Sequence, residues 1–238
     1  MLWYKAWLET RSRFLLSLLG CVALCSFSVY HGNQDALPDT GRAYYYVVLH
    51  GGHGMLCMIW ILAVPLLTMG GLLREKAAGT AGFTLALPVS RARLMAVRTS
   101  MILLQAMALV IVPWIAMFLI SRITGKADSI YQAFFHMTLL AGGGMFFFGT
   151  ALLISSLVEG EYTAPVVTFG VLVAISSVLS STSLHNYSPV EFLVGTEYVD
   201  RHSRLLIGPI PWLRIGCNIL LGALLVAISA KSVQARDF

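Results

Sequence analysis

The side chains that could bind a metal gather near the start of the second apolar run of the sequence. His50 and His53 are one turn apart on a helix, and Cys57 and Met58 follow just below them. Imidazole, thiolate and thioether groups are ligand types that copper or zinc accepts. The alternative, interfacial or pore-lining polar residues, is favoured because no closed ligand set is visible. His50 and His53 are therefore the candidates for a metal site, weighed against that simpler interpretation.

Catalytic and nucleotide-binding patterns are missing from the sequence. It contains no H-E-x-x-H metalloprotease motif and no G-x-x-x-x-G-K-[ST] phosphate loop, and its one Gly-Lys pair, Gly125-Lys126, is followed by Ala127. Glu159 and Glu161 fall in a turn between apolar runs. Intramembrane catalysis needs ionisable groups at membrane depth. We therefore predict a non-catalytic chain with no cofactor of its own.

Apolar helices must position these residues. Hydrophobic residues make up 58% of the 238 and charged residues only 11%, whereas a soluble domain carries about a quarter charged residues. Asp, Glu, Lys and Arg are absent from long stretches, and a membrane helix needs roughly 20 apolar residues. The sequence predicts an all-α, polytopic membrane protein, a single domain over 1–238. Its six spans are expected at about 14–31, 46–73, 94–120, 131–157, 163–182 and 211–230.

The distribution of basic residues predicts the orientation. Most of the 16 Lys and Arg residues lie in the N-terminal segment, in the loop after the second span and in the C-terminal tail. Cytoplasmic segments carry such an excess, so both termini are expected in the cytoplasm. Residues 1–13 mix Trp and Tyr with Lys and Arg, which predicts a short amphipathic helix at the interface. Residues 190–198, in the longest outer loop, are expected to form a short helix over the outer mouth.

Small and polar residues inside the spans predict how the helices pack. Glycines cluster early in the second span and again in the fourth, at Gly142, Gly143, Gly144 and Gly149. Glycine lets helices approach closely in lipid, so internal packing is favoured over a hinge or a substrate path. The polar residues Gln105 and Asn218, also within spans, are expected to form hydrogen bonds between helices.

The loop at 74–93 is the one cytoplasmic segment long enough to be structured. Ala78, Gly82 and Leu85 recur at helical spacing. Pro88 ends that helix, and Ser90 is well placed to cap the next one, which opens the third span. The pattern predicts a short helix, a proline break and a capped membrane helix.

Two strings in this loop resemble a known signature. Residues 75–80 read EKAAGT and residues 87–91 read LPVSR, which resembles the E-x-x-x-G-T and L-P-V-S-R elements of ABC-2 type transporter permeases. That family places a coupling helix here, between the second and third of six spans, where it docks on a separate ATPase subunit. The chain departs from the family at residues 81–83, Ala-Gly-Phe, where many members carry further acidic residues. The resemblance implies an ATPase interface of Glu75, Ala78, Gly79, Thr80, Phe83, Leu87, Pro88, Ser90 and Arg91.

The resemblance also implies a function. It indicates the permease subunit of an ATP-driven transporter, an exporter, in the bacterial cytoplasmic (inner) membrane. ATP and Mg would be bound by the ATPase subunit, and a second permease copy would complete a homodimer or heterodimer, with no nucleic-acid partner. The alternatives are a non-transporting scaffold or sensor of an ABC-like complex, or a copper-related permease, because one family branch serves copper-enzyme maturation. An apolar, aromatic-rich interior without buried charge favours an amphipathic or lipid-like cargo.

Overall fold

The computed structural model describes residues 2–31, 52–69, 90–123, 130–158, 163–181, 188–198 and 208–234. Within these ranges the chain forms helices and no strands, which confirms the predicted all-α class there. The helices are α1 (Leu2–His31), α3 (Gly52–Thr68), α6 (Arg91–Ile123), α7 (Ile130–Leu157), α8 (Thr163–Ser181), α9 (Pro189–Val194), the 3-10 turn η3 (Thr196–Tyr198) and α10 (Trp212–Gln234).

Four of these helices are long and apolar enough to cross a membrane, namely α1, α6, α7 and α10. The helices α3 and α8 are apolar as well, but shorter over their described apolar parts. The chain therefore has the character of a helical membrane protein. Of the second predicted span, 46–73, only residues 52–69 are described. The number of six spans accordingly stays a prediction.

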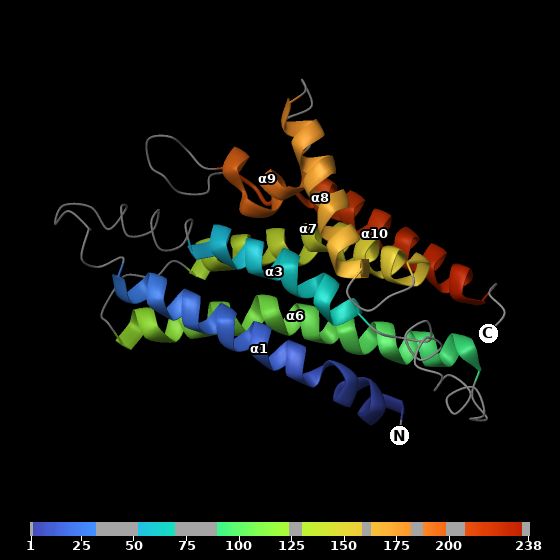
Figure 1. Cartoon of the computed structure of the whole chain (residues 1–238). Helices are drawn as coiled ribbons and strands as arrows, with labels where there is room; N and C mark the ends of the chain where they lie inside the picture. The colour runs from blue at the N-terminus through green and yellow to red at the C-terminus, as the bar shows by residue number, and fades with distance from the viewer. Residues whose placement is uncertain are drawn as a thin grey trace.

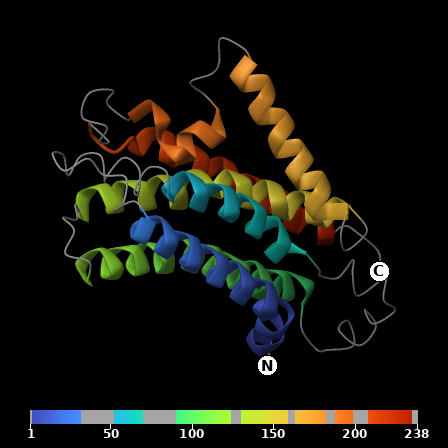
Figure 2. The same ribbon diagram turned by 60° about the vertical axis from the view of Figure 1, so that its left-hand side comes forward.

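The helices pack around α7 (Figure 1). α10 runs along one side of α7, α3 and α6 contact it elsewhere, and α1 packs on α3 and α6. α8 contacts α7 and α3 but leans away from the other helices, as Figure 2 shows. One end of the bundle in Figure 1 holds the first residues of α1 and α6 and the last residues of α3 and α10. We call it the termini end. The opposite end is called the α9 end.

The N-terminal segment differs from the prediction of a separate interfacial helix. Residues 2–13 and the first predicted span form one continuous helix, α1, of 30 residues. The sequence from Leu2 to Leu19 contains neither glycine nor proline, so no residue there ends a helix. The basic residues that suggested a boundary are tolerated within the helix.

Glycines in α7 allow its neighbours to approach closely, as predicted. A Cβ atom built on Gly144 would lie 2.5 Å from the ring of Trp60 in α3. One built on Gly149 would lie 2.6 Å from the carbonyl oxygen of Gly222 in α10. Side chains at these positions would force α3 and α10 away from α7, so the glycines set the close packing of three helices.

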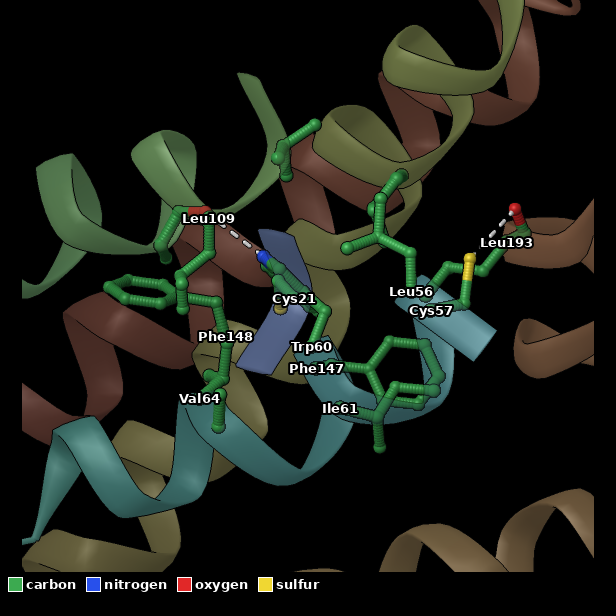
Figure 3. Packing of buried hydrophobic residues seen from close by; sticks show 14 of the residues in the cluster. Cys21, Leu56, Cys57, Trp60, Ile61, Val64, Leu109, Phe147, Phe148 and Leu193 are labelled. Carbon is green, nitrogen blue, oxygen red and sulfur yellow. Dashed lines mark hydrogen bonds between the residues drawn. The ribbon is translucent and has the colours of Figure 1, made fainter. Parts of the chain in front are cut away.

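Buried polar side chains join α6 to two neighbouring helices, α1 and α3. Gln105 of α6 donates from Nε2 to the hydroxyl of Thr10 in α1, at 2.7 Å. The indole of Trp60 donates from Nε1 to the carbonyl of Ala106 in α6, at 2.9 Å, as Figure 3 shows. The prediction for Gln105 is thus confirmed. Asn218 differs, because its side-chain amide donates to a backbone carbonyl one turn earlier in its own helix.

Candidate functional site beneath the α9 cap

The segment of residues 188–198, which we call the α9 cap, confirms the predicted short helix in this region. Pro189 stands in its first turn, where the missing N–H costs no hydrogen bond. Gly195 ends the helix with a φ of 79°, and its N–H donates to the carbonyl of Glu191 at 2.8 Å. Local signals therefore fix where α9 begins and ends, and η3 follows directly.

The apolar face of α9 is buried in the bundle. Phe192 and Leu193 are both buried. They fill the space left by the missing side chain of Gly143 in α7, where a Cβ would lie 2.8 Å from Leu193 Cδ1 and 2.9 Å from Phe192 Cδ1. The α9 cap is therefore packed into the α9 end of the bundle through these two side chains.

Arg214, at the start of α10, holds the other half of the α9 cap. Its guanidinium donates to the carboxylate of Glu197 and to the hydroxyl of Tyr198, the latter at 3.1 Å. It also lies over the ring of Phe192, 5.0 Å from the centroid, a distance typical of a cation–π contact. Arg214 therefore has three partners in one segment, Glu197, Tyr198 and Phe192.

His53 contacts the α9 cap from below. It is buried near the start of α3, and its Nε2 lies 2.9 Å from the carbonyl oxygen of Leu193. A carbonyl oxygen only accepts, so Nε2 carries the proton and donates it. Cys57, one turn along α3, directs its thiol at the same carbonyl, 3.6 Å away, as the dashed line in Figure 3 shows. One backbone carbonyl of α9 thus holds two side chains of α3.

His136 of α7 completes the cluster. Its ring meets the ring of His53 edge to face, with centroids 4.4 Å apart. Trp114 of α6 stacks on His136 at 5.4 Å and 29°. The Nδ1 atom of His136 lies 2.8 Å from the carbonyl of Gln132, so Nδ1 carries the proton by the same reasoning. The side chains of His53, Cys57, Trp114 and His136 are all buried. Two imidazoles from different helices therefore meet inside an apolar bundle.

This histidine cluster, defined by His53, His136, Trp114 and Cys57, is the candidate functional site. Ionisable residues inside membrane helices are costly, and they commonly mark substrate or ion pathways. Sequence reasoning selected His53 but missed His136 and Trp114 as its neighbours. A signal existed, because both histidines lie within two turns of the start of their apolar helices. Because α3 and α7 begin at the same end of the bundle, the two rings could have been expected to lie near each other.

The metal hypothesis is only partly covered by the described residues. His50 lies outside them. His53 lies in the histidine cluster, where its Nε2 donates to Leu193. Within the described part of the chain, no group of three or more His, Cys, Asp or Glu residues is arranged to hold a metal ion.

Most of the predicted ATPase interface also falls outside the described residues, namely Glu75, Ala78, Gly79, Thr80, Phe83, Leu87 and Pro88. Ser90 and Arg91 are described. Ser90 accepts the N–H of Arg93 at its hydroxyl, at 3.3 Å, and the N–H of Leu94 at its carbonyl, at 3.1 Å. Arg91 is the first residue of α6. The predicted serine cap at the start of this span is therefore confirmed.

Comparison with known proteins provides no relative. No protein family, curated protein or solved structure matches the chain. The ABC-2 signature therefore stays a resemblance carried by residues 75–91, and a function must be argued from that resemblance together with the geometry.

Proposed function

We propose that the chain is the permease subunit of an ATP-driven transporter, an exporter with six spans and both termini in the cytoplasm. A separate ATPase would bind ATP and Mg, and a second permease copy would complete the translocation unit. The observation that carries the proposal is the position of residues 75–91, whose strings resemble the ABC-2 signature. They lie in the connection between α3 and α6, and both helices meet this connection at the termini end of the bundle.

Charge supports placing the termini end in the cytoplasm. Lys5, Arg11 and Arg13 lie in the first half of α1, Arg93 and Arg98 at the start of α6, and Lys231 near the end of α10. Among the described residues, only Arg122 and Arg214 belong to the α9 end. Cytoplasmic ends of membrane helices carry an excess of Lys and Arg.

The histidine cluster gives the proposed cargo path a polar region. Both rings donate to backbone carbonyls, which offsets the cost of burying them, and ionisable residues at membrane depth commonly mark substrate pathways. These groups lie directly beneath the α9 cap. We propose that the cargo passes this polar region when the α9 cap moves, and that an amphipathic or lipid-like molecule suits the surrounding apolar walls.

The proposal is tested first by association with an ATPase. The chain would be co-expressed with an ATPase encoded beside its gene that carries a phosphate loop, purified as a complex and placed in nanodiscs. We expect a stable complex whose ATP hydrolysis exceeds that of the ATPase alone. The variants Gly79→Trp and Pro88→Ala should lower this stimulation, because both change the predicted coupling segment.

The outcomes separate the candidate functions. Absence of a complex, or full stimulation by both variants, would contradict the permease assignment. A stable complex that hydrolyses ATP but moves no fluorescent phospholipid or cationic dye across proteoliposomes would favour the scaffold or sensor alternative. A matched control is Gly170→Ala in α8, where an added Cβ meets no atom within 4 Å.

A further inference from the structure

We infer that Arg13 and Arg98 are positioning residues that bind the C-terminal end of α3 to α1 and α6, so that these helices move together during the transport cycle. The inference rests on the proposed function, because it concerns how motion enters the permease. The contacts themselves lie entirely within the described residues, at the termini end of the bundle.

The last carbonyls of α3 are the acceptors. Arg13 of α1 donates from Nη1 to the carbonyl of Met69 at 3.0 Å and, more weakly, to that of Leu66 at 3.4 Å. Arg98 of α6 donates from Nη2 to the same Met69 carbonyl at 3.0 Å. Two guanidinium groups from two helices therefore meet at the end of a third. We call these contacts the arginine clamp.

A residue near the C-terminal end of α7 also bonds to the C-terminal end of α3. Ser155 donates its hydroxyl to the carbonyl of Thr68 at 2.8 Å. The hydroxyl of Thr68 and the N–H of Met69 both bond to the carbonyl of Pro65, at 2.9 and 3.2 Å. The carbonyls that a helix leaves unsatisfied at its C-terminus are here taken up largely by side chains of α1, α6 and α7.

Physical chemistry favours cations at this position. The C-terminus of a helix carries a partial negative charge, so guanidinium groups are attracted to it. An unsatisfied carbonyl near the membrane would be costly, and hydrogen bonds from ionised donors are stronger than neutral ones. Arg13 and Arg98 are only partly exposed, whereas Arg11 and Arg93, in the same two helices, are exposed.

The location gives the arginine clamp its role. Met69 immediately precedes the connection of residues 70–89, and Arg98 lies in the first turns after it. The Arg98–Met69 bond therefore closes the base of the connection that carries the ABC-2-like strings. A force applied to this connection acts on α3 and α6 together, and Arg13 extends that force to α1. Without the arginine clamp, the same force would bend the last turn of α3.

The test compares Arg13→Gln/Arg98→Gln with the matched control Arg11→Gln/Arg93→Gln, which removes the same charge from the same helices. The first measurement is hydrogen–deuterium exchange of a peptide covering residues 64–69, in nanodiscs without ATPase. We expect at least tenfold faster exchange in the clamp variant and unchanged exchange in the control. The second measurement is permease-stimulated ATP hydrolysis in the complex. It should fall at least threefold in the clamp variant, with the yield of complex unchanged, and Arg98→Lys should retain part of it.

The measurements distinguish failure of the arginine clamp, of its coupling role and of the proposed function. Equal exchange in the clamp and control variants would overturn the clamp itself. Faster exchange with undiminished stimulation would overturn its role in coupling while leaving the proposed function intact. If the unmodified chain formed no complex with an ATPase, the proposed function would fail, and the coupling role of the arginine clamp would fail with it.

Discussion

Replacing Gly149 by alanine should destabilise the bundle, because the added atom meets backbone. Its Cβ would lie 2.6 Å from the Gly222 carbonyl oxygen and 3.0 Å from the Gly222 Cα. Ordinary contacts of a Cβ begin near 3.4 Å, so α7 and α10 would have to separate along their whole crossing. Overpacking of this kind costs about 1–3 kcal/mol, and a backbone obstacle favours the upper end. Alanine recovers about 1 kcal/mol of helix propensity. We therefore expect a net loss of about 2 kcal/mol in the free energy of unfolding.

The control is Gly216→Ala in α10. A Cβ there meets no atom within 4 Å, so only the gain in helix propensity of up to about 1 kcal/mol applies. Both variants would be unfolded by titration with SDS in mixed micelles and followed by far-UV circular dichroism. Gly149→Ala combined with Gly222→Ala should cost less than the two single changes added together, because one separation of the helices relieves both clashes. Equal stability of Gly149→Ala and Gly216→Ala would refute the close packing described for this crossing.

Three further predictions concern the polar contacts. In a chain whose other three cysteines are replaced by alanine, Arg214→Gln should raise the rate at which an impermeant maleimide labels Cys57 about fivefold. The reason is that losing partly exposed charge-assisted bonds to the α9 cap costs about 1 kcal/mol. An unchanged labelling rate would argue against Arg214 holding the α9 cap. Gln105→Leu should lower the free energy of unfolding by about 1 kcal/mol. The loss should exceed that of Asn218→Leu, because the Asn218 bond lies within one helix. Equal losses in the two variants would contradict the bond between α1 and α6. Trp60→Phe should cost about 1 kcal/mol in the same titration, and no loss would show that the indole bond contributes nothing.

The helices could be predicted well from the sequence because charges mark their ends. The predicted spans 131–157 and 163–182 became Ile130–Leu157 and Thr163–Ser181. Asp128, Glu159 and Glu161 lie in the connections before and between these two helices. The break expected after residue 13 was wrong for the same reason, because Arg11 and Arg13 suggested an end where nothing in the backbone ends a helix.

The candidate site was harder to predict because its partners are backbone atoms far along the chain. His53 bonds to the carbonyl of Leu193, 140 positions away, and any residue type could supply that carbonyl. The arginine clamp has the same character, since Met69 contributes only its carbonyl oxygen. Residue type and spacing indicated His53, whereas its acceptor and both partners of the arginine clamp depend on how the helices pack.

The two ends of the molecule are connected by α3. At its α9 end, His53 and Cys57 hold the carbonyl of Leu193 in the α9 cap. At its termini end, Met69 is held by the arginine clamp. The helix has 17 residues, so it spans about 25 Å at 1.5 Å per residue. Its middle is fixed at Trp60, which bonds to α6 and packs on Gly144 of α7. Pro65, near the clamped end, removes one backbone hydrogen bond from α3, and the contacts at both ends and at Trp60 hold the two parts of the helix to the same neighbours. In the proposed transporter, a displacement of the clamped end therefore also changes the bond to Leu193, and the ATPase would act on the α9 cap through α3.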